Sequence, residues 1–160
     1  CSRWLMLLLF PTWRLPILRK VCPLIIKAMK ERYNELIAAA KTAAEKAYAP
    51  YSNFTVGAAL LTKSGKIYHG CNIENSSFSV TNCAERTALF SAVSDGEREF
   101  EAIAIVGGQN GDLSEPCFPC GVCRQALSEF CDKDMRVIIA YGDSSKEYTL
   151  KDLLPESFKL

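Results

Sequence analysis

The spacing of apolar positions predicts a helix and then a β-hairpin near the start of the folded part of the chain. Residues 30–48 carry apolar side chains at helical spacing, with several alanines, and Pro50 follows as a stop signal. Residues 54–61 form a β-type run, which a turn at 63–66 connects to a second run at 67–70. Because the first of these strands is apolar on both faces, we expect it to lie inside a sheet.

After the hairpin the pattern alternates between helices and strands. Helical spacing covers residues 84–93 and 121–130, and short apolar β-type runs cover residues 102–106 and 135–141. Residues 147–150 suggest a fifth strand. Helix, hairpin and then two helix–strand alternations predict an α/β fold, a three-layer α/β/α sandwich with a mixed five-stranded sheet.

Residues 1–28 do not share this pattern. They contain five basic residues and no acidic ones, and we expect Pro11, Pro16 and Pro23 to break any long helix. The segment reads as extraneous to the native protein, as a processed or targeting segment, or as an anchor on a membrane surface. No stretch reaches the roughly 20 apolar residues that span a bilayer. We therefore assign the predicted fold to residues 29–160 and expect no membrane span there.

Residues 29–160 form an acidic domain. The formal charge of the whole chain is +1, but five of its 19 basic residues lie in residues 1–28, so 14 basic residues face all 18 acidic ones in the rest. Gripping a nucleic-acid polymer requires clustered Lys and Arg that displace counterions. The composition therefore favours a small neutral substrate over a polymer.

Three cysteines predict a metal site. Cys120 and Cys123 form a Cys-x-x-Cys pair, and Cys83 lies 37 residues before the pair. Both stretches come where a helix is predicted to begin, and the N–H groups and dipole of a helix N-terminus stabilise thiolates. Three thiolates on Zn²⁺ leave one tetrahedral position open, as in catalytic zinc sites. Cys117 is the alternative that would close the site as a fourth ligand, whereas His69 is favoured as an ordinary hairpin histidine.

Glu85 favours a catalytic over a structural zinc site. It lies two residues after Cys83, where a carboxylate either stabilises the helix N-terminus or carries protons beside a metal with an open position. Cys-Ala-Glu together with Pro-Cys-x-x-Cys matches the signature of zinc-dependent deaminases. Arg86 follows, either as a hydrogen-bond donor to the ligand sulfurs or as a surface arginine.

Residues 29–160 resemble a cytidine deaminase of the small homotetrameric zinc-dependent type, within the cytidine/deoxycytidylate deaminase family. The matching stretches follow one another in the family's order and cover nearly the whole domain. They are residues 51–59, 70–75, 83–88, 119–125 and 153–155, followed by Phe158.

The resemblance implies hydrolytic deamination of cytidine and deoxycytidine to uridine and deoxyuridine in cytoplasmic pyrimidine salvage. Such an enzyme is a hydrolase acting on a cyclic amidine C–N bond. One zinc ion per subunit would be held by Cys83, Cys120 and Cys123 and would activate water for attack on C4 of the base. Glu85 would carry protons to N3 and to the leaving ammonia.

The resemblance also implies a nucleoside site shared between subunits of a homotetramer. Asn72 and Glu74 would hydrogen-bond the ribose 3′-hydroxyl, Phe54 would pack on the nucleoside, and the backbone at Ala84 would approach the base. Phe158 would reach the site of a neighbouring subunit. From the residues themselves, Asn72 and Glu74 alternate along an extended segment and so share one face, with ordinary turn residues as the alternative.

Two positions depart from the family pattern, and two rival functions stay open. Phe78 stands where tyrosine is frequent, so a hydroxyl near the subunit interface is missing, and Phe118 replaces a frequent serine before Pro119. One rival is a deaminase of another aminated heterocycle, of the blasticidin type, against which the paired Asn72 and Glu74 argue. The other is a non-catalytic zinc-stabilised module in which Cys117 completes four ligands.

Overall fold

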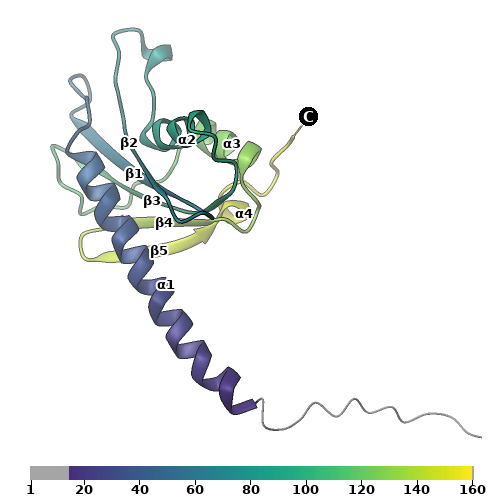
Figure 1. The fold of residues 1–160 in the computed structure, drawn as a ribbon. Coiled ribbons are helices and arrows are strands. Elements are labelled where there is room, and N and C mark those ends of the chain that lie inside the picture. The colour runs from purple at the N-terminus through teal and green to yellow at the C-terminus, as the bar shows by residue number, and fades with distance from the viewer. Residues whose placement is uncertain (1–14, 160) are drawn as a thin grey trace, which may run out of the picture. The chain divides into compact units, whose positions relative to one another are not determined.

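The computed structural model describes residues 15–159, with side chains from residue 27 onward. It contains a five-stranded sheet in the order β2-β1-β3-β4-β5 (Figure 1). The elements are α1 (Leu15–Ala44), β1 (Phe54–Thr62), β2 (Ile67–Cys71), the short 3-10 helix η2 (Phe78–Val80), α2 (Ala84–Ser94), β3 (Phe100–Gln109), α3 (Gly121–Phe130), β4 (Arg136–Tyr141), β5 (Ser144–Thr149) and α4 (Leu150–Leu153). The chain divides into two compact units, and the sheet and the candidate site belong to the unit that begins at Tyr33.

The sheet is mixed, as predicted. Strands β3 and β4 run parallel, and the other neighbouring pairs are antiparallel. The hairpin predicted from the sequence is confirmed as β1 and β2, with Ala59 opposite His69. Strand β1 lies between β2 and β3, so the prediction of an internal strand is also confirmed.

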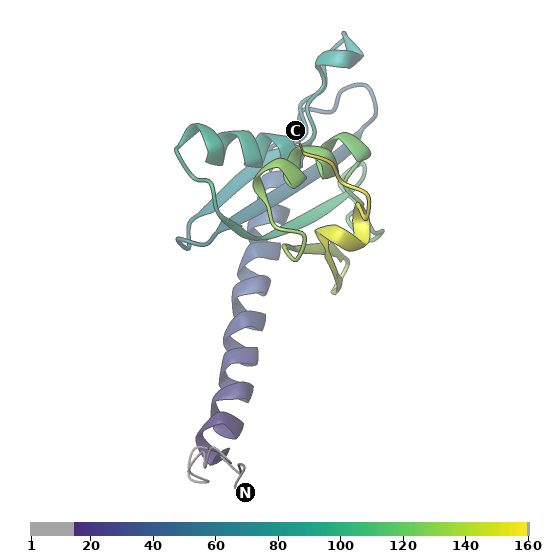
Figure 2. The same ribbon diagram turned by 90° about the vertical axis from the view of Figure 1, so that its right-hand side faces the viewer.

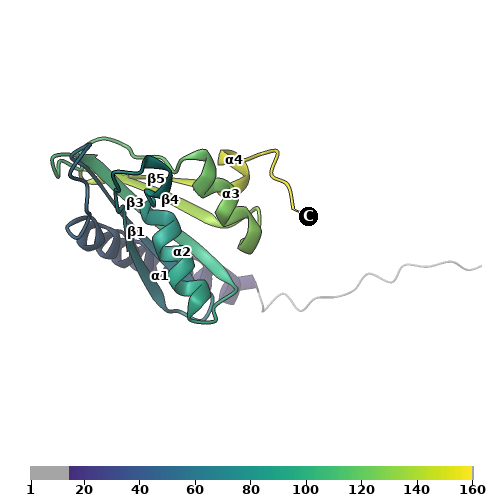
Figure 3. The ribbon, with the colours of Figure 1, turned by 90° about the horizontal axis from the view of Figure 1, so that it is seen from above.

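Helices cover both faces of the sheet, which gives the three predicted layers. On one face, α1 buries Leu36, Ala40 and Ala44 against residues of β1, β3 and β4. On the other face, α2 and α3 bury Ala88 and Leu127 in a second apolar cluster. Figures 2 and 3 show α2 and α3 side by side above this second face. The apolar cluster under α2 and α3 therefore fixes the positions of both helices, and with them their N-termini, on the sheet.

Two glycines let helix backbones lie directly on the sheet. A Cβ atom on Gly70 would lie 2.2 Å from the carbonyl oxygen of Ala84, the first residue of α2. On the opposite face, a Cβ atom on Gly57 would lie 2.1 Å from the carbonyl oxygen of Ala40 in α1. The depth at which α2 sits on the sheet thus depends on the missing side chain of Gly70.

The first helix differs from its prediction at both ends. It begins at Leu15 and continues through Pro16 and Pro23, where we expected no long helix. Proline is tolerated in the first turn of a helix, whereas one in the interior removes a hydrogen bond and crowds the carbonyl of the preceding turn. Within the described residues, no helix is both long enough and apolar enough to cross a membrane.

The same helix ends at Ala44, so the prediction that it runs to residue 48 is wrong. The backbone leaves the helix to pair with the segment after β2. Tyr48 N donates to the carbonyl of Asn72 at 3.0 Å, and Glu74 N donates to the carbonyl of Tyr48 at 2.8 Å. Tyr48, the last residue of the predicted helix, is 57% exposed. Strand β3 also extends from Phe100 to Gln109, beyond both ends of the run predicted over residues 102–106.

Candidate metal centre and active site

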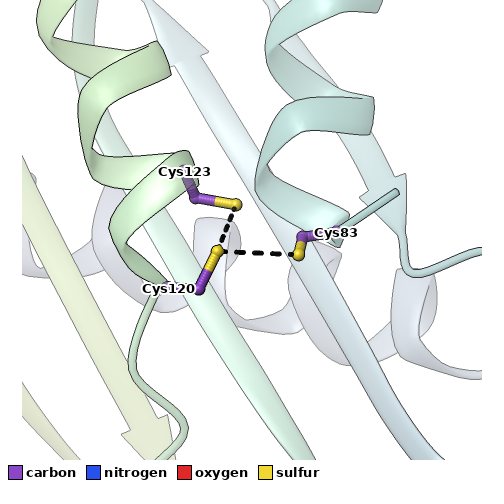
Figure 4. Close-up of side chains that lie close together, drawn as sticks. All are labelled: Cys83, Cys120 and Cys123. Carbon is purple, nitrogen blue, oxygen red and sulfur yellow. Dashed lines mark hydrogen bonds between the residues drawn. The ribbon is translucent and has the colours of Figure 1, made fainter. Parts of the chain in front are cut away.

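Two helices begin at the candidate metal site. Cys83 is the N-cap residue of α2 and Cys120 is the N-cap residue of α3, and neither side chain makes the hydrogen bond that usually caps a helix. The prediction that both cysteine stretches start helices is therefore confirmed. Because neither sulfur caps its helix, the sulfur atoms of Cys83 and Cys120 point toward each other. The sulfur atom of Cys123, in the first turn of α3, points toward the same place (Figure 4).

The three sulfur atoms have the spacing that zinc requires. The Sγ atoms of Cys83 and Cys120 are 3.8 Å apart, and those of Cys120 and Cys123 are 3.5 Å apart. All three lie within 4.8 Å of one another. Tetrahedral zinc with bonds of about 2.3 Å to sulfur separates two ligand sulfurs by about 3.8 Å. The donor set thus fits a zinc ion by both its chemistry and its size.

The rival ligands do not join this cluster. Across residues 27–159, the group of three or more potential ligands comprises Cys83, Cys120 and Cys123, without Cys117 or His69. His69 lies exposed in β2, as expected for a hairpin residue. Burial, and then the charges of Glu85 and Cys83, raise the pKa of the Cys117 thiol to about 12. Cys117 is thus a half-buried thiol that lies near the site but outside the cluster of three sulfurs.

Hydrogen bonds within the cluster favour a thiolate at Cys83. A hydrogen bond from Cys123, and further ones from Arg86 and Cys120, hold the pKa of Cys83 well below its usual range. The same shared proton raises the pKa of Cys123. The arrangement already stabilises one negative sulfur without a metal, as the helix N-termini beneath it would also do.

Arg86 faces the sulfurs rather than solvent. Its Nη2 atom lies 3.8 Å from Cys83 Sγ and donates to the carbonyl of Thr81 at 3.2 Å. Burial alone would lower the pKa of Arg86, but the hydrogen bonds to Cys83 and Cys123 outweigh it and raise that pKa. Its Nε atom is buried without a hydrogen-bond partner. A fixed cation therefore lies against the ligand sulfurs.

Glu85 is a buried carboxyl group beside the cluster. It belongs to the first turn of α2 and is only 4% exposed. Burial raises the pKa of Glu85 to about 7, and the negative charge of Cys83 adds to the effect. A carboxyl group in these surroundings can both accept and release a proton near neutral pH.

Asn72 and Glu74 lie on the segment that adjoins Cys83. Ile73, between them, forms a two-bond antiparallel bridge with Asn82, the residue before Cys83. Asn72 is buried, its Oδ1 atom accepts from the backbone N–H of Val56 at 2.8 Å, and its Nδ2 atom donates to the carbonyl of Phe54 at 2.8 Å. The bridge therefore brings the predicted ribose-binding pair beside the predicted metal ligands.

The remaining predicted residues occupy different positions. Ala84 is fully buried at the start of α2, and Phe54 is half-buried at the start of β1. Phe158 is 65% exposed, and its carbonyl accepts a hydrogen bond from Gln125 of α3 at 3.0 Å. Within one chain, Phe158 thus lies along α3 and leaves its ring open to solvent.

The sequence analysis gave no role to two residues whose hydrogen bonds hold the loop before Cys120 and the carboxylate of Glu74. Arg124 donates from Nε to the carbonyl of Pro119 at 2.7 Å and from Nη1 to the carbonyl of Leu153 at 2.8 Å, so it holds the loop before Cys120. Ser52 contacts both carboxylate oxygens of Glu74. Both residues lie in the motif stretches, but their spacing in sequence does not indicate their partners.

Comparisons with known proteins agree with this geometry. Residues 30–140 match the family model "Cytidine and deoxycytidylate deaminase zinc-binding region". A cytidine deaminase of Sporosarcina psychrophila is 56% identical over 126 residues, which cover 78% of this chain and 89% of that protein. A blasticidin-S deaminase of Bacillus cereus is 36% identical over 104 residues, which cover 62% of this chain and 74% of that protein.

Solved structures show the same fold. The crystal structure of cytidine deaminase from Burkholderia pseudomallei superimposes with a TM-score of 0.72 at 51% sequence identity. The match covers 78% of this chain and 98% of that one.

Proposed function

The chain belongs to the cytidine and deoxycytidylate deaminase family, and from this premise we infer that it is a zinc-dependent enzyme that deaminates cytidine. The observation that carries this function is the placement of three cysteine sulfurs at zinc spacing beside the buried carboxyl group of Glu85. We propose that deoxycytidine is a second substrate, that uridine and deoxyuridine are the products, and that the reaction serves pyrimidine salvage.

Cys83, Cys120 and Cys123 would hold the zinc ion. When bound, zinc lowers the pKa of a water molecule and so supplies a nucleophile at neutral pH. Arg86 and the N-termini of α2 and α3 offset the negative charge of three thiolates, so the site can collect them without a fourth protein ligand.

Glu85 is proposed to move the protons of the reaction. Hydrolysis adds one water across the bond between C4 and the amino group, so that the water oxygen becomes the carbonyl oxygen and the nitrogen leaves as ammonia. Glu85 would take one proton from the water and deliver it to N3 of the base, and would then carry the second proton of the same water to the departing amino group, which leaves as ammonia. Its burial removes competing solvent from these transfers.

The pair Asn72 and Glu74 is proposed to hold the ribose. A carboxylate offers about four acceptor positions, and Glu74 uses three of them for Tyr51 N, Ser52 N and the Ser52 hydroxyl. Asn72 uses one donor and one acceptor position on Phe54 and Val56. An unused acceptor on Glu74 and an unused donor on Asn72 remain, which is what a ribose 3′-hydroxyl needs in order to donate and accept. Phe54 would pack against the nucleoside.

We further propose that four subunits share their active sites. Phe158 and Phe78 leave 65% and 80% of their surfaces exposed in one chain, which supports a role at a subunit interface. Phe158 would complete the nucleoside site of a neighbouring subunit. A cytoplasmic location, the boundary at residue 28, and the targeting or extraneous origin of residues 1–28 stay predictions.

The loss of cytidine absorbance with purified protein tests this function. We expect turnover of cytidine and deoxycytidine, loss of activity after zinc chelation, and recovery on adding zinc. Blasticidin serves as the competing substrate in the same assay. Turnover of blasticidin without turnover of cytidine would move the assignment to the rival deaminase class.

A further inference from the structure

We propose that Ser52 is a positioning residue whose hydroxyl fixes the Glu74 carboxylate for ribose binding and joins it to Phe54. This inference rests on the proposed function, because it concerns how the nucleoside site is built. It does not concern the zinc ligands or Glu85.

The Ser52 hydroxyl lies between the two residues that it would coordinate. It donates to Oε1 of Glu74 and accepts the backbone N–H of Phe54 at 3.0 Å. The Ser52 N–H adds a bond to Oε2 of Glu74 at 3.2 Å, and the Tyr51 N–H adds another at 2.9 Å. The carboxylate of Glu74 is thus held at both oxygens by one turn of backbone.

This turn is itself held by two hydrogen bonds from residues 109 and 110, so Ser52 has a fixed base. Gln109 Nε2 donates to the carbonyl of Ser52 at 2.7 Å, and Asn110 N donates to the carbonyl of Asn53 at 2.7 Å. Asn53 has a φ of 55°, a left-handed conformation that asparagine tolerates better than most residues. Because the end of β3 anchors the turn, the hydroxyl cannot follow Glu74 if the carboxylate rotates away.

The Ser52 hydroxyl also determines the direction from which the Glu74 carboxylate can accept a further hydrogen bond. Its bond occupies one position on Oε1, and the position left free on that oxygen is the one assigned to the ribose. The hydrogen bond from Ser52, followed by that from Tyr51 N, lowers the pKa of Glu74, which keeps the group ionised and purely an acceptor. Without the hydroxyl, Glu74 would sample other rotamers and would have to be ordered by the substrate.

Steady-state kinetics on two substrates test this role. Cytidine carries the 3′-hydroxyl and 3′-deoxycytidine lacks it, so an effect that acts through Glu74 appears only with cytidine. For Ser52→Ala, we expect kcat/KM for cytidine to fall at least about tenfold, which corresponds to the lower end of the range for a hydrogen bond to a charged group. We expect a change of less than about twofold for 3′-deoxycytidine. Ser52→Thr keeps the hydroxyl and should recover most of the activity.

A matched control lies at the other end of β1. Ser64 also bonds a carboxylate from a turn, since its Oγ atom lies 3.3 Å from each carboxylate oxygen of Glu97. Ser64→Ala should leave kcat/KM for both substrates unchanged. If Ser52→Ala does not fold by circular dichroism, Ser52→Cys replaces it, because a thiol has similar size but is a weak donor.

The outcomes separate this inference from the proposed function. An equal loss on cytidine and 3′-deoxycytidine, or a Ser52→Thr variant as impaired as the alanine variant, would overturn the positioning role while cytidine deamination by the wild type still stood. If the wild-type enzyme turned over both substrates equally well, the ribose grip itself would be absent and the role of Ser52 would fall with it. No deamination of cytidine by the wild type would refute the proposed function.

Discussion

Replacing Gly70 with alanine should damage the active site from beneath. Gly70 lies in β2, below the first turns of α2, which carries Glu85 and follows Cys83. The new Cβ atom would lie 2.2 Å from the carbonyl oxygen of Ala84 and 2.4 Å from the backbone nitrogen of Ala88. Both neighbours are helix backbone, so they cannot move aside as a flexible side chain would.

The size of the effect follows from these distances. To restore an ordinary van der Waals separation, α2 has to withdraw from the sheet by about 1 Å. Overpacking of this kind costs about 1–3 kcal/mol, and we expect the upper end, because the strained contact involves backbone atoms. A loss of about 3 kcal/mol lowers Tm by roughly 10 °C in a domain of this size. A misplacement of about 1 Å at the reacting groups lowers kcat by about 100-fold.

Gly57→Ala provides the matched control. Its Cβ atom would meet α1 just as closely, 2.1 Å from the carbonyl oxygen of Ala40, but on the opposite face of the sheet. We expect both variants to lose similar stability in thermal melts, while only Gly70→Ala loses bound zinc and kcat. Equal losses of zinc and kcat in the two variants would refute the reasoning, because general loosening of the sheet would then explain both.

The remaining predictions concern single side chains of the metal centre. Glu85→Gln should keep one zinc per chain by metal analysis while kcat falls at least about 10²–10⁴-fold; a variant near wild-type rate would remove Glu85 from the proton transfers. Cys117→Ala should retain zinc, whereas Cys120→Ala should lose it, and the reverse result would mean that the cluster is assigned wrongly. Arg86→Ala should weaken zinc binding about 10–100-fold in chelator competition, and unchanged affinity would make Arg86 a surface residue in function.

The fold and the cysteine cluster could be predicted because their signals are local. Apolar spacing gave the hairpin and the two helices that begin after Cys83 and Cys120 to within a residue or two. A helix N-terminus is a property of a few consecutive residues, so two such starts could be recognised separately and then combined. The sequence left Cys117 open as a ligand, because a spacing of three residues from Cys120 does not show which way a side chain points.

The end of the first helix could not be predicted in this way. Its apolar spacing continues to Tyr48, and local propensity gives no reason to stop at Ala44. The helix stops there because Tyr48 pairs with residues 72–74, which lie more than twenty positions further along the chain. Tertiary pairing overrides propensity at this point, and the same pairing positions Asn72 and Glu74.

The proposed role of Asn72 and Glu74 cannot be predicted from their spacing in the sequence alone, because it depends on the hydrogen bonds around them. The shared face expected from the sequence says only that both side chains point the same way, whereas the structure shows each of them partly used by its own chain. Groups fixed in this manner cannot rearrange to suit a ligand that lacks a matching hydroxyl. A substrate without it leaves one donor and one acceptor unpaired, which costs more than the missing hydrogen bonds themselves. Contacts within the chain therefore do not compete with the proposed ribose grip but give it its selectivity.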